Sequence, residues 1–449
     1  MSMRVRNGML VILAVVFVLT ASLISIAGGA ITGRSKSKKM NRVTISVQMS
    51  SGPEFEAMVP TAEYWNKNYA DETGISVNIV AGSRVGYMDK IQSQLVSGFA
   101  EPDIVHLFNL FIGNLQPYLE PLDDYFKQDW VMNGPEGMDY SVGMMFPIAL
   151  ETGKGLDGKI YMLPKDMSAV ILYYRTDVVK NPPETYEDFV AIAKQNTQSL
   201  NPNSPTKYGC IVQGKYELWT FCAGIENLWP LGYNIFKPGS TEVAPVHPDT
   251  WKGFEFFEDL YKTGVLHPGI ENAEYPEVAA ALESGAVAMA IQWNTNYHSI
   301  TNCDNAPKVC DKIDIAPPPG YRNVDGSVDR AVYVQTLCLA LNNASNYKEA
   351  AVKFMAWSCF GEGATLYAKA GGSSPVKHVW LADDAMMPYP KLAAMVTEWG
   401  RPLPVYEHMF EIVMIGSIWI QKVLIGEVSA EEAAEGMQKE FASFVASKK

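Results

Sequence analysis

The sequence predicts an α/β protein of at least two domains. Patterns typical of strands and of helices alternate from residue 43 onward, as they do in a doubly wound sheet. The chain has 449 residues, too many for one hydrophobic core. Since 48% of the residues are hydrophobic, the sequence can fill more than one core.

The N-terminal segment, residues 1–33, is predicted to direct export. Arg4 and Arg6 precede a nearly unbroken apolar run at 9–31. This run is long for a signal peptide and close to the ~20 residues that span a bilayer, so a cleaved signal and a retained membrane anchor both fit. A helix buried in a core is disfavoured, since such helices are rarely this long or this terminal. Export places the protein in the periplasm or at the cell surface. A basic tether at 34–41 connects the export segment to the rest of the chain.

The first part after the tether follows a strand–helix–strand order. The runs 43–49, 74–80 and 102–108 are apolar and rich in β-branched residues, which predicts buried strands. The segments between them carry apolar residues every three or four positions, which predicts helices, and Gly98 is suited to end the second one. The predicted helix faces are Met58, Ala62, Trp65 and Tyr69 for the first and Met88, Ile91 and Leu95 for the second.

The second part repeats this alternation. Thr185 and Asp188 have the spacing of a capping box at the start of a helix at 182–195. A helix at 275–285 leads directly into an apolar strand that ends at Trp293. The other predicted elements are strands at 159–164, 168–178 and 331–341 and a helix with Trp251, Phe254, Phe257 and Tyr261 that Gly264 ends.

The charge of the chain excludes one class of partner. The formal net charge is −13, and the first 39 residues contain six basic and no acidic side chains. The rest of the chain therefore carries 30 basic against 49 acidic side chains, a balance of −19. Because so acidic a body repels phosphate backbones and anionic lipid, we expect no nucleic-acid partner.

Six cysteines suit an exported protein whose thiols can oxidise. Cys303 and Cys310 enclose a polar, Pro-containing loop and form the first expected disulfide, and Cys210 with Cys222 forms the second. Cys338 lies in an apolar strand pattern, which favours a free buried thiol. The cysteines lack the C-x-x-C spacing of a zinc site and the six histidines are scattered, so we expect no metal and no cofactor.

Five motifs resemble the extracellular solute-binding proteins of ABC importers, in the class of maltose- and oligosaccharide-binding proteins. Each motif is weak alone, but five in the right order are specific together. The similarity extends over nearly all of residues 42–445. The motifs are YMDKIQSQLVSGFAEPDIVHL (87–107), GKIYMLPKDMSAVILYYRTDVVKNPPETYEDF (158–189), ESGAVAMAIQWNTNY (283–297), IAPPPG (315–320) and GGSSPV (371–376).

The resemblance implies two doubly wound α/β lobes joined by crossover hinge segments, with one solute held between them. It implies a monomeric binding protein, not an enzyme, that passes its solute to the membrane subunits of an ABC permease. The implied hinges lie near 161–166, 314–318 and 357–361. The implied lobes are 42–160 with 315–358 and 165–312 with 362–449.

The candidate site lies in the turns that follow the predicted strands. Ligands of open α/β sheets bind beyond the carboxyl ends of strands, and sites between domains are common. A sugar ring presents C–H groups on its faces and hydroxyls at its rim, which suits aromatic rings beside polar groups. Trp293, followed by Asn294 and Asn296, has this pattern. The further candidates are Trp219, Trp229, Trp399, Tyr406, Ser51, Glu54, Asn109, Lys165, Asp166 and Ser373.

Several aromatic and polar residues also have a structural interpretation. Glu54, Asn109 and Asp166 suit helix caps as well as they suit a ligand. Tryptophans on helix patterns are expected in cores, and these are Trp65, Trp251 and Trp357.

An enzyme is one alternative. A secreted glycan-active enzyme would use a pair of carboxylates, but the acidic pairs at 123–124 and 383–384 are better explained as helix-start or solvated residues. The sequence also lacks the G-x-S-x-G and H-E-x-x-H motifs of two common hydrolase classes.

A binding protein for a solute other than a sugar is the second alternative. A cationic small molecule or peptide would suit an acidic, aromatic cage, which Glu54, Asp166 and Trp293 could form. An anionic solute would need arginines at the turns. The basic residues near the turns are Lys165, Arg84 and Arg401.

Overall fold

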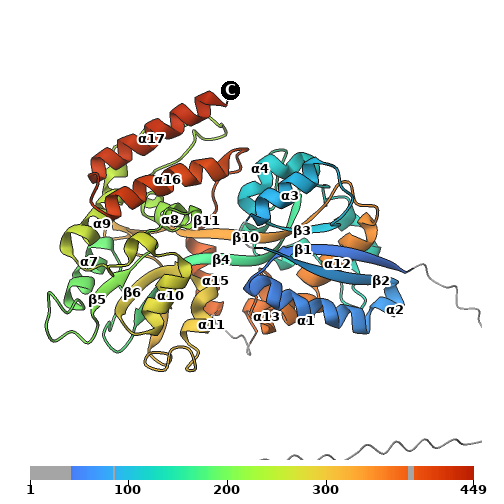
Figure 1. Cartoon of the computed structure of the whole chain (residues 1–449), viewed down its shortest axis with the longest axis horizontal. Coiled ribbons are helices and arrows are strands. Elements are labelled where there is room, and N and C mark those ends of the chain that lie inside the picture. Colours follow the sequence, from blue (N-terminus) through green and yellow to red (C-terminus); the bar gives the residue numbers. More distant parts are fainter. Residues whose placement is uncertain (1–41, 84–85, 383–388, 449) are drawn as a thin grey trace, which may run out of the picture. The chain divides into compact units, whose positions relative to one another are not determined.

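The computed structural model describes residues 42–83, 86–382 and 389–448 (Figure 1). The predicted export segment 1–33 and the tether 34–41 lie outside these ranges. Within them, every helix is either too short or too polar to cross a membrane.

One mixed sheet runs through the described part of the chain. Its strands are β1 (Val43–Ser50), β2 (Ile75–Gly82), β3 (Ile104–Phe108), β4 (Met162–Arg175), β5 (Tyr208–Ile211), β6 (Val287–Trp293), β7 (Ile313–Ala316), β10 (Val332–Leu341) and β11 (Gly400–Arg401). Their order is β2-β1-β3-β10-β4-β6-β5, with β11 beside β10 and β7 beside β4. A separate hairpin consists of β8 (Tyr321–Arg322) and β9 (Val328–Asp329).

The first three strands confirm the predicted doubly wound start. β1 lies parallel to both β2 and β3. Helix α1 (Pro53–Asn68) connects β1 to β2, and α3 (Tyr87–Val96) connects β2 to β3. Parallel strands need such crossover helices, which cover the sheet and make its strands apolar throughout.

The strand β4 differs from the prediction of two separate strands. It is one continuous strand of 14 residues, all of them buried. The sequence pattern breaks at Pro164, which lacks the N–H that a strand interior uses. Opposite β10, Pro164 faces Cys338 and Asp166 faces Leu337. Lys165 is thus the extra residue of a bulge, which lets the strand continue past the proline.

The long strands β4 and β10 link the two parts of the sheet. β10 pairs with β3 through residues 337–341 and with β4 through 334–340. β4 continues beyond this pairing, with β6 along 170–174 and with β7 along 172–175. In Figure 1 both strands lie between β1–β3 on one side and β5 and β6 on the other. A substitution or a movement in the middle of β4 therefore affects both parts of the sheet.

Two sets of helices pack together. The first set is α1, α12 and α13, and the second is α8, α9, α16 and α17. Besides α1 and α3, the α-helices of the described residues are α2 (Ala70–Thr73), α4 (Ile112–Leu115), α5 (Asp129–Met132), α6 (Pro147–Thr152), α7 (Tyr186–Gln195), α8 (Leu218–Gly224), α9 (Thr250–Thr263), α10 (Tyr275–Glu283), α11 (Tyr297–Ile300), α12 (Lys348–Phe360), α13 (Glu362–Lys369), α14 (Lys377–Trp380), α15 (Tyr389–Trp399), α16 (Met409–Leu424) and α17 (Ala430–Ser447).

Local signals predicted the ends of two helices correctly. Thr185 Oγ1 accepts a hydrogen bond from the Asp188 backbone N–H, and Asp188 Oδ2 accepts one from the Thr185 backbone N–H, both at 3.2 Å. These bonds form the capping box of α7. Gly264 follows α9 with φ 68°, in the left-handed region that favours glycine.

The tryptophans expected in cores divide into two cases. Trp65 and Trp357 are fully buried, with ring centroids 5.0 Å apart, as predicted. Trp251 is only half-buried, so its prediction as a core residue is wrong. It lies in the first turn of α9 and packs against the core from its edge, whereas Phe254 and Phe257 farther along the helix are buried.

The cysteines are only partly as predicted. Cys303 and Cys310 form the expected disulfide, and Cys338 is free and buried. The predicted pair of Cys210 and Cys222 is wrong, because both thiols are free and buried. Cys210 lies within β5 and Cys222 within α8, so each side chain belongs to the interior packing of its own element.

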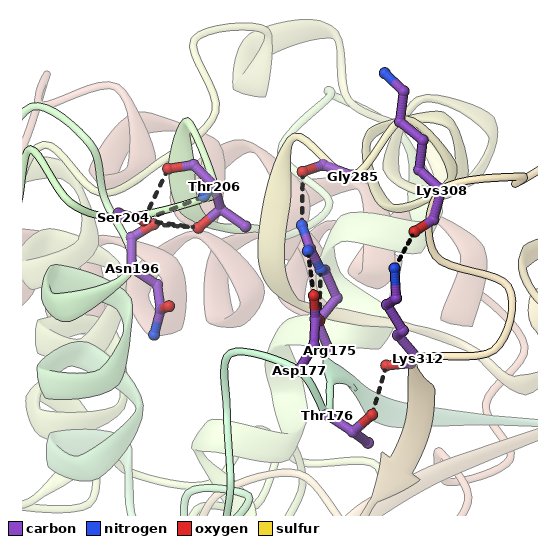
Figure 2. Close-up of polar contacts among 9 residues, drawn as sticks. All are labelled: Arg175, Thr176, Asp177, Asn196, Ser204, Thr206, Gly285, Lys308 and Lys312. Carbon is purple, nitrogen blue, oxygen red and sulfur yellow. Dashed lines mark hydrogen bonds and ion pairs between the residues drawn. The ribbon is translucent and has the colours of Figure 1, made fainter.

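The end of β4 is fixed by hydrogen bonds to the turn before β6 (Figure 2). Arg175 donates to both carboxylate oxygens of Asp177, at 3.0 and 2.6 Å, and to the Gly285 carbonyl at 3.0 Å. Thr176 donates from its hydroxyl to the Lys312 carbonyl at 3.1 Å, just beyond the disulfide loop. These contacts hold the start of β6, and so the register of the strand that carries Trp293.

Candidate functional site

Trp293 lies at the centre of a row of aromatic rings. It is the last residue of β6 and is only 5% exposed. Its ring meets Trp219 of α8 at a centroid distance of 5.5 Å and Tyr333 of β10 at 5.7 Å, both edge to face. Trp219 in turn lies 5.4 Å from Phe108, and Tyr333 lies 6.1 Å from Trp229. We call these five residues the aromatic row.

The aromatic row joins the two parts of the sheet. Phe108 ends β3, whereas Trp219 and Trp293 come from α8 and β6. The sequence predicted Trp219, Trp229 and Trp293 but not Phe108 or Tyr333. Tyr333 falls in an unbroken apolar strand pattern, and only the pairing of β10 with β4 brings it beside Trp293.

Asn294, next to Trp293, is fully buried and bonded at both ends of its amide. Its Oδ1 accepts from the Ala169 backbone N–H at 2.6 Å, and its Nδ2 donates to Ser373 Oγ at 3.3 Å. Asn296 is 8% exposed and donates to the Tyr275 carbonyl at 3.5 Å. The Asn294 amide thus ties β6 to β4 and to the segment that contains Ser373.

Asp166 is buried in the middle of β4 with three donors around it. Its carboxylate accepts from the Ser373 backbone N–H at 2.7 Å, from the Tyr367 hydroxyl at 3.1 Å and from the Ser168 hydroxyl at 3.3 Å. Burial, together with the negative charge of Glu54, raises the pKa of Asp166 to about 7. Asp166, Asn294 and Ser373 therefore form a second, polar cluster in the centre of the sheet.

Lys165 points into the interior. It is 0% exposed, donates to the Ser358 carbonyl and lies 4.1 Å from the centre of the Tyr367 ring. Burial lowers the pKa of Lys165 to about 8. Burial also lowers the pKa of His106, to about 3, and the charge of Lys165 adds to this effect.

The remaining polar candidates line the ends of β1 and β3. Asn109 is buried, and its Oδ1 accepts from the Thr336 backbone N–H at 3.2 Å. Ser51 and Glu54 are half-buried at the start of α1. The N-cap of α1 is Gly52 without a side-chain bond, so Glu54 is not its cap.

The C-terminal candidates lie apart from the centre of the aromatic row. Tyr406 is buried against Phe236 at 4.9 Å, and half-buried Trp399 has the Arg330 guanidinium 5.7 Å from its ring. A cavity of about 20 Å³ is lined by residues 402–405, by Asn109 and by Thr152. The residues that line this cavity include 402–405 but neither Trp399 nor Tyr406.

A buried carboxyl group, that of Glu226, contacts Tyr333 of the aromatic row. Glu226 is 1% exposed and accepts from the Tyr333 backbone N–H. Burial raises the pKa of Glu226 well above its ordinary value, which favours the neutral form of this carboxyl. Among the described residues, no group of three His, Cys, Asp or Glu side chains could hold a metal ion.

Comparison with known proteins identifies matches over most of the chain. The family of bacterial extracellular solute-binding proteins matches residues 47–358. A maltose-bound structure of T. maritima MalE3 superposes with a TM-score of 0.75 at 21% identity, over 89% of this chain and 99% of that one. An ABC transporter solute-binding protein of Agrobacterium radiobacter K84, in complex with ribitol, gives 0.73 at 19% identity, over 90% and 98%. A Brucella abortus (strain 2308) protein named as a binding protein is 24% identical over 336 residues, 72% of this chain and 74% of its own.

Proposed function

Because the chain belongs to the bacterial extracellular solute-binding proteins, we propose that it captures a sugar or oligosaccharide between two lobes and delivers it to an ABC importer. The family consists of binding proteins, not of enzymes. The observation that carries the proposal is the aromatic row, in which Trp293 of β6 is linked through Trp219 to Phe108 of β3.

The chemistry of the row suits a sugar. Aromatic rings cover the C–H faces of a pyranose, and amides and hydroxyls beside them reach its rim. Ligand sites are usually apolar walls with a few placed polar groups. Here the rings form such a wall, and the Asn294 amide, bonded to protein at both ends, holds the strand end that carries Trp293. The solved relatives described above carry maltose and ribitol, both of them polyhydroxylated. This similarity supports a carbohydrate or polyol as the solute class.

The sequence implies lobes of 42–160 with 315–358 and 165–312 with 362–449, and we propose these lobes with two of the crossings moved. A hinge near 161–166 agrees with the way β4 connects both parts of the sheet. We place the second crossing along β10 rather than near 314–318. Gly320 bridges to Thr185, and Tyr321 donates to the Lys252 carbonyl of α9 at 3.2 Å, which binds this segment to the second part. We place the third crossing after α13 rather than near 357–361. Glu362 of α13 accepts hydrogen bonds from Tyr64 at 2.8 Å and Tyr69 at 2.6 Å, which binds this helix to the first part.

The proposed mechanism is hinge closure around the solute. To move the population from 1:99 to 99:1, a solute must prefer the closed state by roughly 5.5 kcal/mol. A few buried hydrogen bonds at about 1 kcal/mol each, with ring stacking of similar size, supply this difference. The closed form would then dock on the membrane subunits of the permease, as a monomer, in the periplasm or at the cell surface.

The hydrogen bonds and the pKa of Asp166 argue against the alternative of a cationic solute. The cage would need the Asp166 carboxylate, but Ser373, Tyr367 and Ser168 already donate to it. Burial also raises its pKa to about 7, so that much of it is neutral near neutral pH. A polyamine remains a useful negative control for the binding screen.

A thermal-shift screen of neutral sugars, sugar alcohols, uronates and polyamines tests this function, followed by calorimetric titration of each hit. We expect one or more carbohydrates to raise the melting temperature and bind with 1:1 stoichiometry. Small-angle scattering with and without the hit should show a smaller radius of gyration for the complex. Binding of polyamines alone, or turnover of an oligosaccharide by the purified protein, would contradict the proposal.

A further inference from the structure

Within the described residues, Arg401 is a cation without a counter-charge at the Trp229 end of the aromatic row. Its guanidinium carbon lies 4.8 Å from the centre of the Trp229 ring, and its Nη2 donates to Asn234 Oδ1 at 2.6 Å. Both partners are neutral. The side chain is half-buried, and burial lowers the pKa of Arg401.

The other described arginines all have carboxylates near them. Arg42, Arg175 and Arg322 form ion pairs with Asp71, Asp177 and Glu184. Arg330 is the closest match to Arg401, because it also lies over an indole ring. The charges of Glu184 and Glu398, however, stabilise its cation. Within the part of the chain that the structure describes, Arg401 has no such neighbour.

The position of Arg401 connects it to the candidate site. In the sheet it lies beside Tyr333, the neighbour of Trp293 in the aromatic row. The residues that follow it, 402–405, line the cavity opposite Asn109. The guanidinium therefore lies at the Trp229 end of the row, opposite the end at Phe108.

Among the described residues, no carboxylate forms an ion pair with this cation. Glu226 is buried and accepts from the Tyr333 backbone N–H, and burial raises the pKa of its carboxyl well above the ordinary value. Asp166 lies in the polar cluster and takes its donors from the protein. Nε and Nη1 of Arg401 have no hydrogen-bond partner in the described ranges, so donors remain for a ligand.

We propose that Arg401 binds an anionic group of the solute, so that the preferred ligand is a sugar acid and not a neutral sugar. The inference rests on the proposed function and narrows its substrate class. A guanidinium recognises a carboxylate with paired N–H donors, and its partial burial strengthens the interaction. The aromatic rings would cover the sugar while Arg401 binds the acid group, and the stacking on Trp229 holds the guanidinium plane in place.

The test is titration calorimetry of the full chain with matched pairs of ligands, D-galacturonate against D-galactose and D-glucuronate against D-glucose. At least one acid should bind tenfold or more tightly than its neutral partner. Arg401→Gln should reduce this preference to less than threefold, whereas Arg401→Lys should keep part of it. Arg330→Gln is the matched control and should leave the preference unchanged. Unfolding curves of the variants establish that each one folds.

The outcomes separate this inference from the proposed function. If only neutral sugars bind, or if Arg401→Gln keeps the full preference for the acid, the inference is wrong and the proposed function stands. If no member of either series binds but another neutral sugar or sugar alcohol of the thermal-shift screen does, the inference is wrong and the proposed function stands. If no carbohydrate of the screen binds, both are wrong. Tighter binding of an acid that Arg401→Gln abolishes supports both.

Discussion

The Asn294 side chain connects two strands and a distant segment through one amide. It accepts from the backbone of Ala169 on β4 and donates to Ser373 Oγ, 79 positions farther along the chain. Ser373 in turn donates from its backbone N–H to Asp166. The residue that follows Trp293 thus fixes the strand end that presents the ring.

We expect Asn294→Ala to lower the free energy of unfolding by about 1–3 kcal/mol, because it leaves the buried Ala169 N–H unpaired. Urea denaturation followed by circular dichroism measures this change. Asn196→Ala is the control, since among the described residues the buried Asn196 amide bonds only to the Ile192 carbonyl, one turn back, at 3.0 Å. Equal losses for the two variants would contradict the role of Asn294.

Asp166 should make the stability of the protein depend on pH. Its pKa rises from 3.8 to about 7 on folding, so the folded state binds its proton more tightly than the unfolded state. The stabilisation by this proton is complete below pH 3.8 and is lost as the pH rises through 7. Relative to Asp166→Asn, the native protein should therefore lose stability between about pH 4 and pH 7.

The check is the difference in unfolding free energy between the native protein and Asp166→Asn, measured from pH 4 to pH 8. Asp177→Asn is a suitable control. The hydrogen bond from Arg175 lowers the pKa of Asp177, so its contribution is lost only toward acid pH and stays flat across this range. A difference for Asp166→Asn that is flat, or that rises with pH, would rule out the assignment.

The disulfide should be the only one among the described cysteines. Non-reducing peptide mapping should find Cys303 joined to Cys310, with the other described cysteines alkylated only after unfolding. Replacing Cys303 and Cys310 together by Ala should cost about 2 kcal/mol, because the bond closes a short loop of the unfolded chain. Reductant should destabilise the native protein by a similar amount and leave the double variant unchanged. Fast alkylation of Cys303 in the folded protein would contradict the bond.

Much of the fold follows from local patterns in the sequence. The β1–β3 strands, the Thr185–Asp188 box and the Gly264 helix end depend on residues a few positions apart, and each was predicted. The continuity of β4 past Pro164 was not, because the bulge at Lys165 depends on the register of β10. Neighbours that come from different strands leave no local pattern.

In the candidate site, too, features that depend on neighbours in sequence could be predicted, and contacts between distant segments could not. A ring followed by amides at 293–296 drew attention to the end of β6, but the pattern could not tell where the amides point. In the folded chain the Asn294 amide bonds to protein at both ends. Tyr333 and Phe108 lacked any signal because they join Trp293 only through sheet pairing and helix packing. The false pair of Cys210 and Cys222 failed for this reason too, since their closeness in sequence does not bring β5 and α8 together.

The most direct test of the central claim, that a solute is held against Trp293, is calorimetric titration of the identified carbohydrate into Trp293→Ala and Trp130→Ala. Trp130 is 37% exposed on α5 and takes no part in the aromatic row, so its variant should keep the native affinity. Trp293→Ala should bind at least tenfold more weakly, with unfolding curves establishing that it still folds. Native affinity in a folded Trp293→Ala variant would contradict the account.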